Sequence, residues 1–256
     1  MTDMSTGATP VAFSVGRVLS RAFEVLSRNL GKFIVITVIA WSPYLVLLLV
    51  LQSFPSAPRT GVGAGGFAAL SAGAILTFIL QAVLRVISQA VILYGTFQDM
   101  RGQSFDIADS FEKGLSRFFP ILGLIICAGI ATGFAFLFFI IPGLILATMW
   151  YVALPICVVE QLGPFASMSR SAALTKGNRW EVFGILLLLG LAALIIGAII
   201  GFVLALIGGG FAVAIGSFLW QAVFSAYSSI VVAVAYYGLR ASKEGIDIER
   251  MAAVFD

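Results

Sequence analysis

Residues 181–207 read EVFGILLLLGLAALIIGAIIGFVLALI, and this stretch decides the class of protein. It carries one charged residue, Glu181, and exceeds the roughly 20 apolar residues with which a helix crosses a bilayer. The chain of 256 residues is 61% hydrophobic and 11% charged, with a mean hydropathy of +1.09. Soluble domains are about 45–50% apolar and about 25% charged. Because the apolar runs lack the period-two alternation of barrel strands, the sequence predicts an all-α, polytopic membrane helix bundle.

The composition also excludes several classes of chemistry. The sequence has no histidine, so histidine-ligated zinc or haem and histidine acid–base catalysis are excluded. Cys127 and Cys157 both fall inside apolar runs, which argues against a structural disulfide. The net charge of +3 is not concentrated in one basic arm, so nucleic acid is not an expected partner. We expect no cofactor and no metal.

Six transmembrane helices are expected, at approximately residues 33–52, 67–96, 119–141, 143–160, 181–207 and 211–239. Tight hairpins are expected at Pro142-Gly143 and at residues 208–210, and a longer loop at 53–66. Residues 1–13 lack the layout of a signal peptide, so we expect the first span to be retained.

The basic residues fall on one side of this layout. Thirteen of the fifteen lie before the first span, between the second and third, between the fourth and fifth, or after the sixth; the exceptions are Arg59 and Arg85. The positive-inside rule therefore predicts that both termini are cytoplasmic.

Three segments between the spans have the pattern of amphipathic, interfacial helices: residues 14–33, 104–119 and 163–180. In the first, the basic residues Arg17, Arg21, Arg28 and Lys32 lie opposite an apolar face of Val15, Val18, Leu19, Ala22, Leu26, Leu30 and Phe33. These four basic residues are the candidate contacts to the lipid surface. The third segment has a weaker apolar face of Phe165, Met168 and Ala172.

Each amphipathic segment precedes two spans, which suggests a three-fold repeat of surface helix plus transmembrane hairpin within a single membrane domain of residues 1–256. The units are approximately residues 12–100, 101–162 and 163–256. Two small-residue pairs, Gly129 with Gly133 and Gly197 with Gly201, permit close helix approach, and packing within the monomer is favoured over a dimer interface.

Three blocks of sequence resemble a known family: YGTFQDMRGQ at 94–103, IPGLILATMWYVALPICVVEQLGPFASMSRSAALTKGNRWEVFG at 141–184 and YYGLRASKEGIDIER at 236–250. All three are similar to the membrane domain of glycerophosphoryl diester phosphodiesterases and to related bacterial multi-span proteins of uncharacterised function. The resemblance implies an integral membrane module in a bacterial inner membrane. The hydrolase domain of such enzymes has no counterpart here, so no enzymatic activity is expected.

One polar stripe lies inside the predicted spans. Gln81, Arg85 and Gln89 recur at every fourth position, and Gln221 and Ser225 of the sixth span could face them, with Ser228 and Ser229 as further companions. One interpretation is a hydrophilic pathway or a lipid-headgroup site. The other is that Arg85 snorkels to the interface while the glutamines bond between helices.

Two other groups of residues invite a chemical interpretation. TKGNRW at 175–180 combines Gly, Lys and Arg but lacks the glycine spacing and preceding strand of a P-loop, so a helix stop at Gly177 with interfacial Arg179 and Trp180 is favoured. Asp106, Asp109 and Glu112 share one helix face but have no nucleophile–base set beside them. No catalytic residue is predicted.

Similarly, Tyr236 and Tyr237 are interpreted as part of an interfacial aromatic belt, with Arg240 and Lys243 at a cytoplasmic exit and Gly245 as a helix stop. The expected function is that of a non-enzymatic inner-membrane protein that binds lipid or protein partners, in membrane organisation or as an accessory or scaffold subunit. The alternative is a transporter or channel for a lipid or small solute. Expected partners are membrane lipids, and another membrane protein or a second copy of the chain are further alternatives.

Overall fold

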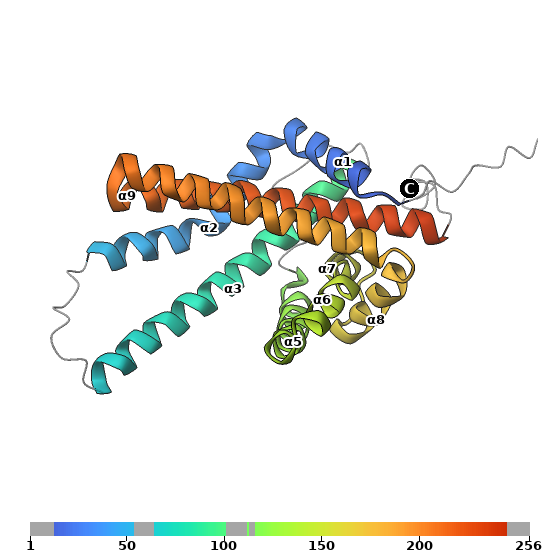
Figure 1. Ribbon diagram of the computed structural model, residues 1–256, viewed down its shortest axis with the longest axis horizontal. Helices are drawn as coiled ribbons and strands as arrows, with labels where there is room; N and C mark the ends of the chain where they lie inside the picture. The colour runs from blue at the N-terminus through green and yellow to red at the C-terminus, as the bar shows by residue number, and fades with distance from the viewer. Residues whose placement is uncertain (1–12, 54–63, 101–111, 113–115, 245–256) are drawn as a thin grey trace, which may run out of the picture.

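The computed structural model describes residues 13–53, 64–100, 112 and 116–244, and the described part is helical with no strand. This confirms the predicted all-α class. The helices shown in Figure 1 are α1 (Val15–Arg28), α2 (Leu30–Ser53), α3 (Ala64–Met100), α5 (Phe118–Phe138), α6 (Ile140–Met149), α7 (Ala153–Val159), α8 (Pro164–Thr175) and α9 (Arg179–Glu244).

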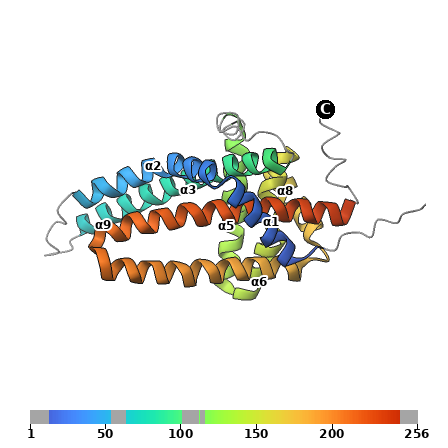
Figure 2. The ribbon, with the colours of Figure 1, turned by 90° about the horizontal axis from the view of Figure 1, so that it is seen from above.

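Helix α9 consists of two limbs, Arg179–Leu206 and Ile215–Glu244, which lie side by side (Figure 2). The Trp220 indole nitrogen lies 3.2 Å from the position that a Cβ on Gly197 would occupy. Gly216 likewise faces Leu204. The chain therefore reverses between Leu206 and Ile215, the segment that contains the predicted hairpin.

Four helical segments among the described residues are long and apolar enough to cross a membrane: Phe118–Phe138, Ile140–Val159, Arg179–Leu206 and Ile215–Glu244. They coincide with the last four predicted spans. The first two predicted spans fall in α2 and α3, which are helical but are not among these four segments. Six transmembrane helices therefore stay a prediction.

The hairpin between α5 and α6 differs from the predicted one. The chain turns at Phe139, whose backbone is extended (φ −154°, ψ 136°), and not at Pro142-Gly143. Pro142 instead lies in the first turn of α6, where backbone N–H groups have no partner within the helix, so its missing N–H costs no hydrogen bond. Gly143 is buried against the Phe136 ring, and the absence of a Cβ there lets the two helices approach.

The predicted span at 143–160 is also divided. Helix α6 ends at Met149, and α7 begins at Ala153 after a turn that includes Trp150. Pro155 explains part of this division, because as the third residue of α7 it has no N–H to offer a continuous helix. The helix is thus interrupted near the middle of this predicted span.

Helix α1 has the predicted amphipathic pattern, but its apolar face is covered by protein. Val18, Ala22, Val25 and Leu26 are buried, and α1 packs against α9. The Tyr227 hydroxyl of α9 donates a hydrogen bond of 3.2 Å to a carbonyl of α1. The predicted apolar face is therefore used in docking α1 onto α9 and not in covering lipid.

The predicted helix at 14–33 is two helices. Helix α1 ends at Arg28, and Asn29 separates it from α2, so Leu30 is exposed and does not extend the apolar face of α1. The Asn29 amide donates a 2.6 Å hydrogen bond to the Asp99 carboxylate at the end of α3. This bond connects the junction of α1 and α2 to the end of α3.

Helix α8 begins as predicted, with Gly163 before it and Pro164 at its first position, but its buried face is different. Met168 is buried, whereas Phe165 is 73% exposed. Most of the remaining buried positions are polar, and their burial is possible because their hydroxyls donate to backbone carbonyls. These residues are Ser167, Ser171 and Thr175.

The other predicted amphipathic helix, at 104–119, lies largely outside the described residues. A short helix followed by two longer helical segments is found twice in the described part, as α1–α2–α3 and as α8 with the two limbs of α9. The three-fold repeat and its three units stay predictions.

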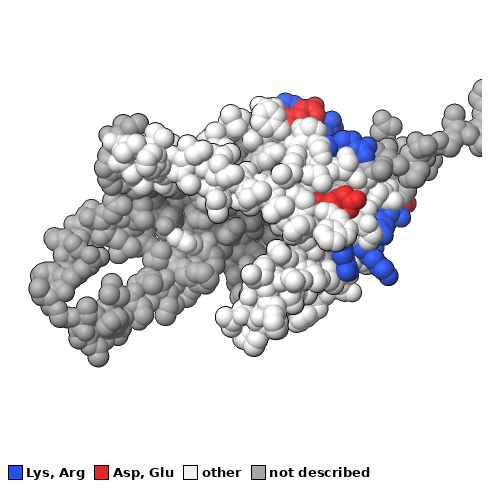
Figure 3. Space-filling view, viewed as in Figure 1, with Lys and Arg blue, Asp and Glu red and all other residues white. Residues whose placement is uncertain are grey.

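Charged side chains gather at one end of the molecule. Figure 3 shows the visible Lys, Arg, Asp and Glu over α1 and over the adjoining end that contains α8 and the start of α9, while the rest of the described surface in this view is uncharged. This distribution agrees with the predicted sorting of charge to one side of the spans. The side of the membrane on which this end lies stays a prediction.

Candidate functional site

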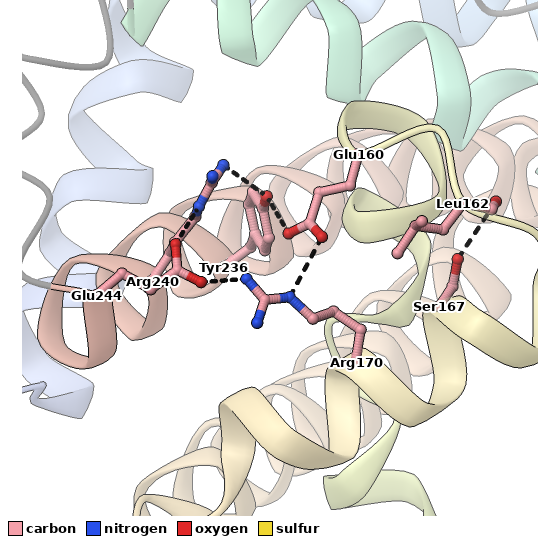
Figure 4. Close-up of polar contacts among 7 residues, drawn as sticks. All are labelled: Glu160, Leu162, Ser167, Arg170, Tyr236, Arg240 and Glu244. Carbon is pink, nitrogen blue, oxygen red and sulfur yellow. Dashed lines mark hydrogen bonds and ion pairs between the residues drawn. The ribbon is translucent and has the colours of Figure 1, made fainter.

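At the charged end, five side chains from three segments form a closed circuit of hydrogen bonds, which we call the polar ring (Figure 4). Glu160 directly follows α7, Arg170 lies on α8, and Tyr236, Arg240 and Glu244 lie on the second limb of α9. The ring therefore joins residues that lie 74 and 76 positions apart in the sequence.

The donors and acceptors of the ring are well matched. Arg170 Nε donates to Glu160 Oε2 at 3.2 Å, and Arg170 Nη2 donates to Glu244 Oε1. Arg240 Nε donates to Glu244 Oε2 at 2.7 Å, and Arg240 Nη1 donates to the Tyr236 hydroxyl at 3.2 Å. That hydroxyl in turn donates to Glu160 Oε1 at 3.0 Å, which closes the ring.

The local sequence explains this geometry. Tyr236, Arg240 and Glu244 are spaced four residues apart, so they share one face of α9. Glu160 approaches that face from the end of α7, and Arg170 approaches it from α8. Tyr236 is fully buried, and the Glu160 side chain is only 17% exposed.

The two arginines offset the charges of the two carboxylates. Partial burial lowers the pKa of Arg170, but the hydrogen bond to Glu244 and the attraction of Glu160 and Glu244 outweigh this effect and raise its pKa. Arg170 therefore remains a cation. Each carboxylate already accepts two hydrogen bonds, an arrangement suited to holding helices together rather than to taking a proton from a substrate.

A second set of contacts explains the division between α6 and α7. The Ser171 hydroxyl donates a 2.8 Å hydrogen bond to the Met149 carbonyl, and the Thr175 hydroxyl lies 3.3 Å from the same oxygen. Carbonyls at the end of a helix have no partner within the helix, so the Ser171 hydroxyl satisfies a group that the break exposes. The Thr175 hydroxyl is nearby but lies closer to the Ser171 carbonyl, at 2.9 Å.

The predicted helix stop at Gly177 is confirmed. Helix α8 ends at Thr175, and Gly177 has a φ of +96° two residues later. The Lys243 ammonium lies 3.6 Å from the position of a Cβ on Gly177. TKGNRW is therefore a helix terminus packed near the end of α9, which supports the favoured interpretation over nucleotide binding.

We predict that Gly177→Ala destabilises the protein by about 1–2 kcal/mol, because only glycine adopts this backbone conformation without strain. The matched control is Gly163→Ala, since Gly163 has an ordinary extended backbone and nothing within 4 Å of its Cβ position. Thermal unfolding of both variants in mild detergent measures the difference. Equal midpoints for the two variants would contradict the role of the positive φ.

The predicted intramembrane stripe is only partly described. The side chain of Arg85 lies outside the described residues, Gln81 and Gln89 are half-buried on α3, Gln221 is exposed and Ser225 is buried on α9. Ser228 and Ser229 donate to the Ser225 carbonyl of their own helix. Within the described side chains, no hydrogen bond joins the α3 glutamines to Gln221 or Ser225. The transport pathway stays a prediction.

The predicted lipid contacts are exposed, but their charge is partly offset. Glu24 lies 3.2 Å from Arg21 and 2.8 Å from Arg28, and Arg17 donates to Ser14. Lys32 is exposed at the start of α2. One carboxylate is thus shared by two of these arginines, and their contact with lipid stays a prediction.

The interpretation of Tyr236 and Tyr237 as an interfacial belt is wrong. Both are buried, and the Tyr237 ring packs edge-on against Phe97 of α3 with centroids 5.2 Å apart. Tyrosine occurs both at membrane interfaces and in protein interiors, because its hydroxyl can bond to water or to a protein group. The partner of the Tyr236 hydroxyl is Glu160. The spacing of Tyr236, Arg240 and Glu244 was the available signal of a shared polar face.

The predicted acidic positions give little further chemistry. Asp106, Asp109 and Gly245 lie outside the described residues, and Glu112 is exposed. Among the residues with described placement, no group of three or more acids or cysteines is arranged to hold a metal ion.

All residues of the polar ring and of the contacts at Met149 lie in two of the blocks that carry the family resemblance, 141–184 and 236–250. Residues 121–240 match the membrane domain of glycerophosphoryl diester phosphodiesterase. The resemblance expected from the sequence is thereby confirmed over this segment. The match includes every member of the polar ring except Glu244, which lies just beyond it. Neither a curated protein nor a solved structure matches the chain.

With its long apolar helices, this membrane-domain match indicates a multi-pass membrane protein. The distinctive polar residues of the membrane domain have structural tasks here: they end helices, satisfy a freed carbonyl and connect α7, α8 and α9.

Proposed function

We propose that this protein is a non-catalytic membrane module whose charged end binds the headgroups of anionic lipids. In this proposal the charged end faces the cytoplasm of a bacterial cell, and the module supports membrane organisation or a neighbouring membrane protein. The observation that carries the proposal is the exposed basic face of α1, which is fixed to α9 through its opposite, buried face.

The arrangement suits a surface that recognises charge. Arg21 and Arg28 have side chains that are 56% and 54% exposed, so their free N–H groups can reach phosphate oxygens. Basic residues near an anionic leaflet contribute about 1 kcal/mol each. Docking against α9 orders the helix before lipid arrives, which lowers the entropy cost of binding.

We predict that the triple variant Arg17→Gln, Arg21→Gln and Arg28→Gln binds phosphatidylglycerol about a hundredfold more weakly than the parent protein, given roughly 1 kcal/mol per charge. The full chain in detergent is titrated with phosphatidylglycerol or phosphatidylcholine, and bound lipid is counted by native mass spectrometry. Phosphatidylcholine binding is expected to change little.

Glu24→Gln is the control of opposite sign. It removes the carboxylate that Arg21 and Arg28 share, so phosphatidylglycerol should bind more tightly. The proposal is wrong if the triple variant and Glu24→Gln both bind phosphatidylglycerol as the parent does.

A further inference from the structure

A groove of about 350 Å³ lies between α6 and the start of α9, and no residue of the polar ring lines it. Helix α6 contributes Ile141, Leu144 and Ile145, and α9 contributes Arg179, Trp180 and Phe183. The α6 residues recur at helical spacing, so one face of α6 forms one wall. The volume is within the range of about 300–1,000 Å³ that is typical of ligand sites.

The groove is apolar along α6 and cationic at the beginning of α9. Ile141 is 71% exposed and belongs to a segment long and apolar enough to span the membrane. The one hydroxyl in the wall, that of Thr148, donates to the Ile145 carbonyl and so offers its proton to nothing in the groove. The apolar part of the groove therefore suits a hydrocarbon chain.

Arg179 supplies the charge at the other end. Its guanidinium makes no ion pair within the described part of the chain, and it is the first residue of α9, where the helix dipole also favours an anion. Glu181 is two positions further along and does not share its helix face. Trp180 is 83% exposed beside it, as is common for tryptophan at a membrane interface.

We propose that this groove is a binding site for one anionic phospholipid, with an acyl chain along α6 and the phosphate at Arg179. This inference rests on the proposed function, because it requires the charged end to lie at a membrane surface. The lipid it describes binds at other residues than the basic face of α1. Any bilayer lipid could fill the apolar part, because lipid surrounds the spans on all sides. Selectivity therefore comes from the charge-assisted hydrogen bond to Arg179.

The test is cross-linking of the full chain, reconstituted in phosphatidylcholine vesicles, to trace phosphatidylglycerol that carries a photoreactive group on one acyl chain. We expect cross-links concentrated on α6 and the first turns of α9. Arg179→Gln should reduce them about tenfold, as expected for loss of one charge-assisted contact. Leu144→Trp, which fills the apolar part, should reduce them as well.

Lys176→Gln is the matched control, because Lys176 is also an exposed cation close to α9 but does not line the groove. It should leave the cross-links unchanged. Cross-links spread evenly over all the spans, or equal losses for Arg179→Gln and Lys176→Gln, would overturn the inference. The triple variant of α1 tests the headgroup proposal separately, since it should retain the groove cross-links.

Discussion

Replacing Arg170 with methionine is expected to lower the free energy of unfolding by about 2–3 kcal/mol, somewhat below the cost of breaking a fully buried ion pair. The change removes the hydrogen bonds from Arg170 to Glu160 and Glu244, whose side chains are only 17% and 22% exposed. Both carboxylates then remain partly desolvated with one donor fewer. The effect stays below that of full burial because Arg170 itself is 34% exposed, which lets water screen the site.

The rate at which a maleimide labels Cys157 measures this loss of stability. Cys157 is fully buried and lies three positions before Glu160, so its thiol should react only when this region opens. In a Cys127→Ser background, Arg170→Met should accelerate labelling of Cys157 about 30- to 150-fold, the factor that corresponds to the expected loss of stability. Tyr236→Phe, which removes only one hydroxyl from the ring, should have a smaller effect of about 1 kcal/mol.

Arg21→Met is the matched control. Arg21 also forms an ion pair, with Glu24, but the side chains of both residues are more than half exposed, and such pairs contribute little. Its labelling rate should stay close to that of the parent. If Arg21→Met and Arg170→Met accelerate labelling equally, the polar ring does not hold α7, α8 and α9 together.

The features that could be predicted from the sequence are those that depend on neighbouring residues. The spacing of Val18, Ala22 and Arg21 indicates which face of α1 is apolar, and Gly163-Pro164 indicates where α8 begins. Gly177 is a further local signal, because a helix often ends at a glycine with positive φ. In each of these cases the signal and the structure lie within a few positions of each other.

The polar ring could not be predicted in this way, because Glu160 and Tyr236 meet only after the chain has folded over 76 positions. Apolar spans add a second difficulty, since lipid and protein interiors favour the same side chains. The glycine pairs illustrate it. Gly197 packs against Trp220 as predicted for a contact within the monomer, but Gly129, Gly133 and Gly201 have nothing within 4 Å of a Cβ.

The placement of α1 is the part of the fold on which the sequence and the structure differ most, and Ala22→Glu should show it directly. Ala22 is fully buried between α1 and its neighbours, so a carboxylate there is expected to cost several kcal/mol and to release α1 from α9. Phe23→Glu is the control, because Phe23 is the next residue but is 63% exposed. It should leave α1 docked.

An engineered disulfide can report the docked state. A methyl carbon of Val15 lies 3.4 Å from the Cβ position of Gly184, which is compatible with a bridge between Val15→Cys and Gly184→Cys in a background without other cysteines. The bridge should form in the parent and with Phe23→Glu, and should largely fail to form with Ala22→Glu. If α1 instead turned its apolar face to lipid, the bridge would form in none of the three proteins, and the basic face would not be held beside the spans.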